Sequence, residues 1–136
     1  MDRGRGPVMG YAALVGIVLG ALGLLGFFSN PIVGDAARNP IFVTGTVLDL
    51  VLLIAGSLAL YVAFSLRGDQ QAVGVLAIGV LFLALFLLTL NSANLSGLLS
   101  NPVNSADRGL HLVVAVASIA VGWYGHSSLR RLITAR

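Results

Sequence analysis

The segment AVGVLAIGVLFLALFLLTL, from Ala72 to Leu90, contains no charged residue and a single hydroxyl side chain, that of Thr89. About 20 mainly apolar residues in a helix cross roughly 30 Å of hydrocarbon, so this segment is long enough to span a bilayer. Three more segments meet the same requirement, at about residues 8–28, 41–66 and 107–125. The sequence therefore predicts an all-α membrane protein, a bundle of four transmembrane helices that forms one domain over residues 1–136.

The overall composition agrees with this prediction. Hydrophobic residues make up 57% of the 136 residues and charged residues only 10%, which is not the balance of a water-soluble globule. A formal net charge of +3 would suggest a nucleic-acid partner for a soluble protein, but in a membrane protein such charge orients the helices. We therefore expect no nucleic-acid partner. The absence of Cys excludes disulfides and thiolate chemistry.

Turn-forming residues separate the four predicted spans. Asn39-Pro40 precedes the second span, and Pro40 is expected in its first helical turn, where a missing amide costs nothing. Before the fourth span, Asn104 is followed three residues later by Asp107, a spacing typical of a helix-capping pair. These two helix starts are the boundaries that the sequence defines best.

The arginines divide unevenly between the two sides of a four-span bundle. Because positive charge accumulates on the cytoplasmic side of a membrane, the larger group predicts that both termini lie inside. We expect a multi-pass protein of a prokaryotic plasma membrane or a specialised internal membrane, with a composition typical of a high-GC prokaryote. The inner group is Arg3, Arg5, Arg67, Arg130, Arg131 and Arg136, and the outer group is Arg38 and Arg108.

Small residues recur at helical spacing on two of the spans. Such faces allow the backbones of two membrane helices to approach closely, and the glycine pair Gly16-x-x-x-Gly20 is an example. The partner helix belongs either to this chain, which we favour, or to another subunit. The expected packing positions are Ala12, Gly16, Gly20 and Gly23 in the first span, and Ala115, Ser118 and Gly122 in the fourth.

A short motif occurs twice. Ser29-Asn30-Pro31-Ile32 is echoed by Ser100-Asn101-Pro102-Val103, each time before an even-numbered span. The echo indicates either a duplicated helix pair in parallel orientation or independent use of Asn and Pro in two turns.

Asp49 is the ionisable residue most informative about function. If the second span begins near Ile41, Asp49 lies about eight residues, roughly 12 Å, along the helix and within the hydrocarbon. A carboxylate at the centre of a membrane helix is unfavourable by about 2.5 to 3.5 kcal/mol on insertion scales. Asp49 is therefore either a site for a proton, a cation or a partner, or a neutral acid that is hydrogen-bonded to another helix.

His111 begins the polar face of the fourth span, about one turn below the outer surface. It is a candidate for a structural hydrogen bond, for pairing with Asp49, or for ligation of a metal or a tetrapyrrole. The second histidine, His126, is about 15 residues or roughly 22 Å away on the same helix, so the two cannot ligate one haem. We expect no cofactor and no metal, apart from the alternative of a tetrapyrrole at His111.

The segment Asn104-Ser105-Ala106-Asp107-Arg108-Gly109-Leu110-His111 resembles the characteristic segment of a family of small four-span bacterial membrane proteins of unknown function. Family members carry a similar segment, ending in Leu-His, before the second span. This chain has Asn39-Pro40-Ile41-Phe42 there, without a histidine. The resemblance implies the four-span architecture and draws attention to Asp107 and His111, but it implies no activity.

Two functions of different classes remain. The first is a structural or accessory subunit that packs on a larger membrane complex of respiratory or photosynthetic type, with lipid and other membrane subunits as partners. The second is a small homo-oligomeric transporter that uses Asp49 to bind a proton or a cation. No catalytic motif is present, so we expect no enzyme activity and no catalytic residues. Binding of a tetrapyrrole at His111 is a weaker third alternative.

Overall fold

The computed structural model describes residues 6–135 and contains four long helices. All four are long and apolar enough to cross a membrane, which confirms the predicted class of an all-α four-helix membrane bundle. The helices are α1 (Pro7–Leu25), α2 (Thr46–Ser65), α3 (Gly68–Asn91) and α4 (Ser105–Thr134).

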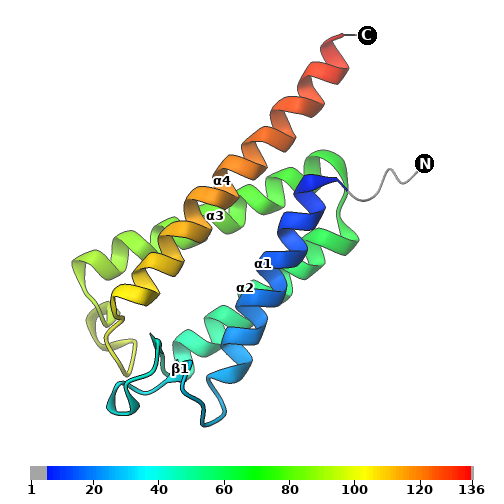
Figure 1. Ribbon diagram of the computed structural model, residues 1–136. Helices are drawn as coiled ribbons and strands as arrows, with labels where there is room; N and C mark the ends of the chain where they lie inside the picture. The colour runs from blue at the N-terminus through cyan, green and yellow to red at the C-terminus, as the bar shows by residue number, and fades with distance from the viewer. Residues whose placement is uncertain (1–5, 136) are drawn as a thin grey trace.

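The four helices associate as two antiparallel pairs (Figure 1). Helix α1 packs mainly on α2, and α3 packs mainly on α4, with fewer contacts between the pairs. Two long connections, residues 26–45 and 92–104, lie at one end of the bundle, which we call the loop end. Helix α1 begins, α2 joins α3, and α4 ends at the opposite end, which we call the terminal end.

The charged residues agree with this division into two ends. Arg67, Arg130 and Arg131 lie at the terminal end, and Arg38 and Arg108 lie at the loop end. The remaining members of the predicted inner group, Arg3, Arg5 and Arg136, lie outside the described residues. That the loop end faces outward stays a prediction from the distribution of arginines.

The start of the second helix differs from the prediction. Helix α2 begins at Thr46, not near Ile41, because the preceding residues form a small parallel sheet at the loop end. In that sheet β1 (Val33–Gly34) pairs with β2 (Phe42–Val43), with Val33 opposite Phe42. The expected place of Pro40 in the first turn of the helix is therefore wrong, since hydropathy does not distinguish a buried extended segment from a helix.

Three other boundaries also moved: α1 ends at Leu25, three residues before the predicted end of the first span, and the other two helices are longer than predicted. Helix α3 begins at Gly68, four residues before the predicted Ala72, and α4 continues to Thr134, well beyond residue 125. Hydropathy detects only the part of a helix that lies in hydrocarbon, whereas a helix continues for as long as its residues favour it. Two single-turn 3-10 helices complete the loop end, η1 (Ala36–Arg38) and η2 (Leu95–Gly97).

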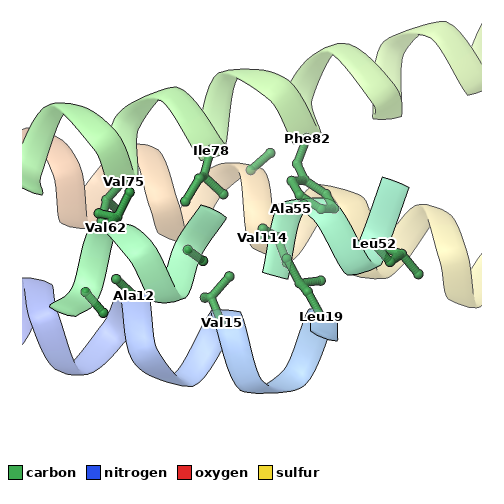
Figure 2. Close-up of a cluster of buried hydrophobic side chains, with 13 residues drawn as sticks. Ala12, Val15, Leu19, Leu52, Ala55, Val62, Val75, Ile78, Phe82 and Val114 are labelled. Carbon is green, nitrogen blue, oxygen red and sulfur yellow. The ribbon is translucent and has the colours of Figure 1, made fainter. Parts of the chain in front are cut away.

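Apolar side chains from all four helices meet between the two pairs (Figure 2). Leu19 of α1 and Phe82 of α3 are fully buried there, and Leu52 of α2 and Val114 of α4 belong to the same cluster. This core is continuous and apolar through the middle of the bundle. Few polar groups take part in it: Tyr11 of α1 and Ser118 of α4 share one hydrogen bond between the pairs, and His111 is buried beside Phe82.

The two helix pairs bury equivalent positions. Helices α2 and α4 align when their N-caps, Gly45 and Asn104, are superimposed. The equivalent buried positions are then Leu48 and Asp107, Leu52 and His111, Ala55 and Val114, and Ala59 and Ser118. The same alignment makes Leu60, which faces Gly16, equivalent to Ile119, which faces Gly79. The packing therefore supports an internal repeat of a helix pair in parallel orientation.

The repeated Ser-Asn-Pro motif does not mark this repeat. Asn30 follows α1, and its Nδ2 donates to the carbonyl oxygens of Leu25 and Phe28 at 2.7 and 2.8 Å. Asn101 instead precedes α4 and donates to the carbonyl oxygen of Thr44 at 3.0 Å. The two motifs occupy different positions in their loops. The two helix pairs therefore correspond in the positions of their buried residues, not in this motif.

The close packing of α1 on α2 can be tested by adding a methyl group to one of the glycines in their interface. A Cβ on Gly56 would lie 2.7 Å from the Cα atom of Gly20 and 2.9 Å from the carbonyl oxygen of Gly16, so Gly56→Ala should separate the two helices. We expect it to lower the free energy of unfolding by about 1 to 3 kcal/mol, the usual effect of overpacking. The measurement is thermal or denaturant unfolding in detergent micelles.

Gly20→Ala is the matched control, because a Cβ on Gly20 meets no atom within 4 Å. This variant should unfold like the wild type or be slightly more stable, as expected for Ala in place of Gly in a helix. Equal destabilisation by both substitutions would contradict the assigned interface.

Candidate functional site at the loop end

A polar cavity of about 390 Å³ opens at the loop end, between the end of α1, the start of α2 and the two long loops. It combines acidic, hydroxyl and amide side chains with two phenylalanines. Its walls are formed by Gly26, Phe27, Phe28, Ser29, Gly34, Asp35, Arg38, Thr44, Gly45, Thr46, Asp49, Ser100 and Asn101.

Asp49 lies in the first turn of α2. The prediction that it lies about 12 Å along the helix is therefore wrong, because the helix begins at Thr46. Its side chain is nevertheless buried, with only 2% of the residue exposed. The carboxylate occupies a notch beside Gly26, where any Cβ would overlap it. The amide dipoles at the start of α2 favour a negative charge at this position.

One carboxylate oxygen of Asp49, Oδ1, is buried without a hydrogen-bond partner among the described residues. An unsatisfied buried polar atom is rare in native proteins and calls for an explanation. The hydroxyl of Thr44, which is also 2% exposed, has no hydrogen bond of regular geometry but lies beside the Asp49 carboxylate. A buried carboxylate and a neighbouring hydroxyl therefore belong to residues that line one cavity.

The sequence did not identify Thr44. Its backbone is fixed by the small sheet, since its amide donates to the carbonyl oxygen of Gly34 at 2.9 Å. Its carbonyl oxygen accepts from Asn101 at 3.0 Å. Both contacts depend on how the loops fold, so no local spacing could have indicated the role of Thr44.

Asp35 and Arg38 provide opposite charges at the exposed rim of the cavity. The carboxylate of Asp35 accepts from the amide of Ala37 at 2.9 Å and from Asn101 at 3.2 Å. These hydrogen bonds, led by the backbone one, hold the pKa of Asp35 below its usual value. Arg38 donates from Nη1 to the hydroxyl of Ser29 at 3.0 Å.

Asn104 and Asp107 form the predicted helix cap. The amide of Asp107 donates to Asn104 Oδ1 at 2.9 Å, and the amide of Asn104 donates to Asp107 Oδ2 at 3.0 Å. This reciprocal arrangement is a capping box. Asp107 Oδ2 also accepts from the amide of Val43 at 3.2 Å, and Asn104 donates to the carbonyl oxygen of Ile41 at 3.0 Å. The cap therefore attaches strand β2 to α4.

His111 is buried in the bundle, with 1% of the residue exposed. Its ring lies 5.8 Å, between centroids, from the ring of Phe82, and its Nδ1 has no hydrogen-bond partner. Among residues 6–135 no hydrogen bond or ion pair joins His111 to Asp49, so the structure does not bring these two candidates into contact. His126 is partly exposed and contacts the carboxylate of Asp69 at the terminal end.

The predicted packing faces lie inside this chain. On α1, Gly16 and Gly23 face α2, while Gly122 of α4 faces the backbone of α3. Ser118 of α4 shares a hydrogen bond of 2.7 Å with the hydroxyl of Tyr11, which links α4 to α1. Ala12 and Ala115 are buried in the core, while Gly20 is approached by Gly56 through its backbone.

Within the described part of the chain, no group of three or more acidic or histidine side chains could hold a metal ion. Comparison with known protein families, with curated proteins and with solved structures finds no match to this chain. The resemblance to a family of four-span bacterial proteins stays a prediction.

The role of Asn104 as the N-cap of α4 can be tested by removing its side chain. Asn104→Ala loses the acceptor for the amide of Asp107 and the donor to Ile41, so we expect unfolding to become easier by about 1 to 2 kcal/mol. Ser105→Ala changes the neighbouring exposed residue and should leave stability within about 0.5 kcal/mol. Denaturant unfolding in micelles measures both, and indistinguishable stabilities of the two variants would contradict the assigned role of the cap.

Proposed function

We propose that this protein is a structural or accessory subunit that packs on a larger membrane complex. The projecting end of α4 is the observation that carries this proposal. The helix has 30 residues, which corresponds to about 45 Å at 1.5 Å per residue, and its last turns extend alone beyond the other helices (Figure 1).

The projecting turns of α4 expose two apolar residues, Leu132 and Ile133, and the half-buried Leu129 continues the same face where α4 leaves the bundle; we call these three residues the α4 stripe. Their spacing of three and four places them on one face of the helix. Leu132 is 66% exposed and Ile133 is 74% exposed. Arg130 and Arg131 lie beside the stripe, which suits a partner surface that combines apolar and acidic groups.

The interior of the bundle also favours a structural role. Between the loop end and the terminal end the core contains Leu19, Leu52 and Phe82, each buried in apolar surroundings. A transport route needs polar groups or water at this depth. The polar groups buried at this depth are few, namely His111 and the hydrogen-bonded pair Tyr11 and Ser118, and they form no continuous polar path; the small-residue faces are used within the chain.

A mild-detergent pull-down of tagged protein from its own membranes tests this proposal. We expect the wild type to recover a larger complex in constant stoichiometry, and a variant with Ala at all three positions of the α4 stripe to lose it. The control replaces Leu112, Val113 and Val116, exposed residues elsewhere on α4, and should retain the complex. Recovery of the tagged chain alone, or only as a homo-oligomer, would overturn the proposal.

Transport is the second candidate function, and the buried Asp49 favours it. Because the core of one chain is closed, this function requires a second copy that completes the route. Asp49→Asn removes the titrating group while keeping its shape, so it should abolish substrate-driven proton flux in reconstituted vesicles. Asp69→Asn, the same change at the terminal end, is the control. Unchanged flux in Asp49→Asn would remove Asp49 from the mechanism.

Tetrapyrrole binding has less support. A pigment would need access to the ring of His111, but this ring is buried against Phe82. The visible absorption spectrum of the purified complex tests this alternative directly.

A further inference from the structure

We propose that the polar cavity at the loop end binds a small organic ammonium ion, with Asp49 and Thr44 as its principal ligands. This inference does not depend on the role of the protein as an accessory subunit. It follows from the chemistry of the cavity walls.

The first argument is a buried carboxylate with little to neutralise it. Asp49 is 2% exposed, its Oδ1 has no regular hydrogen bond among the described residues, and its polar neighbour is the hydroxyl of Thr44; both residues belong to the cavity walls. Leaving a buried polar group unsatisfied is unfavourable by about 1 to 3 kcal/mol, and by more for a charged group. An ammonium group has only hydrogen-bond donors, like the side chain of Lys, and would neutralise the carboxylate of Asp49, with the neighbouring Thr44 as a second oxygen ligand.

The second argument is that the carboxylate is held in place. Its notch exists because residue 26 is glycine, and a Cβ there would displace the Asp49 side chain. Gly45 provides a similar space on the other side, which the hydroxyl of Ser100 enters. A preorganised carboxylate binds a cation without an additional ordering penalty.

The third argument is the charge and type of the ligands. The buried wall carries one carboxylate, and the other acid of the cavity, Asp35, lies at the exposed rim near Arg38. Calcium prefers six to eight oxygen ligands and magnesium a near-ideal octahedron of six, and the described residues contain no cluster of three or more acidic or histidine side chains. One buried negative charge fits a monovalent cation.

The fourth argument is the size of the cavity and its aromatic walls. A volume of about 390 Å³ is at the lower end of the range for small-molecule sites, about 300 to 1,000 Å³, and is far larger than a bare ion. Phe27 and Phe28 form part of the wall. Aromatic rings attract ammonium groups and pack against the attached carbon chain, so an organic cation fits better than an alkali ion.

The experiment uses the full chain in detergent micelles and ethylammonium chloride as the probe, followed by saturation-transfer NMR and by thermal unfolding. We expect saturable binding in the NMR experiment and a melting temperature that rises with the logarithm of the ethylammonium concentration above the dissociation constant. Sodium chloride at the same ionic strength should not reproduce the effect. Ammonium chloride should bind more weakly, because it lacks the carbon chain.

Three variants assign the binding to the cavity. Asp49→Asn should weaken ethylammonium binding by at least about tenfold, as expected for loss of a charge-assisted hydrogen bond. Thr44→Val should weaken binding by about fivefold. Asp69→Asn, the matched acid-to-amide change at the terminal end, should bind like the wild type. Circular dichroism checks that each variant keeps its helices.

Gly26→Ala provides an independent variant that retains every charge. It should weaken binding because the methyl group displaces the carboxylate of Asp49. The proposal is overturned if no saturable ethylammonium binding occurs, if Asp49→Asn binds as tightly as the wild type, or if sodium saturates the site and ethylammonium does not.

Discussion

The close approach of α1 to α2 and of α3 to α4 is the constraint on which the rest of the structure depends. Lipid tails are as apolar as the side chains they contact, so helices in a membrane associate through close packing and hydrogen bonds rather than through the hydrophobic effect. Gly16 and Gly56 remove side chains from the first interface, and Gly79 and Gly122 remove them from the second. Once each pair is formed, larger residues such as Leu19 and Phe82 are left to fill the space between the pairs.

The loop end depends on this packing in a second way. Because the pairs are fixed relative to one another, the loop of each pair reaches the other: Asn101 binds the carbonyl oxygen of Thr44, and Asp107 binds the amide of Val43. The first loop is therefore attached to the second pair by side chains of that pair. The cavity between them is a consequence of two packed pairs, and neither pair contains it alone.

The sequence predicted what depends on local pattern. Four apolar segments gave the number of spans, and the spacing of Asn104 and Asp107 gave the cap of α4, because each signal lies within a few residues of chain. It did not predict the small sheet of Val33 and Phe42, whose partners are brought together by the loop, and so it placed Asp49 too far along its helix. Asp49 was identified as a candidate because a buried acid is unusual in any context, whereas Thr44 became one only when folding placed it in the same cavity.

The two helix pairs differ at the N-terminal ends of α2 and α4, and this difference shapes the wall of the cavity. In the second pair the N-cap position holds Asn104, whose side chain satisfies the amide of Asp107 and closes the end of α4. In the first pair the equivalent position is Gly45, which provides no side-chain cap, and the hydroxyl of Ser100 occupies the space beside it. Leu48, the equivalent of Asp107, cannot complete a capping box, and the next residue, Asp49, belongs to the wall of the cavity. The same feature, the absence of a capping side chain at Gly45, leaves the start of α2 uncapped and leaves room for the cavity.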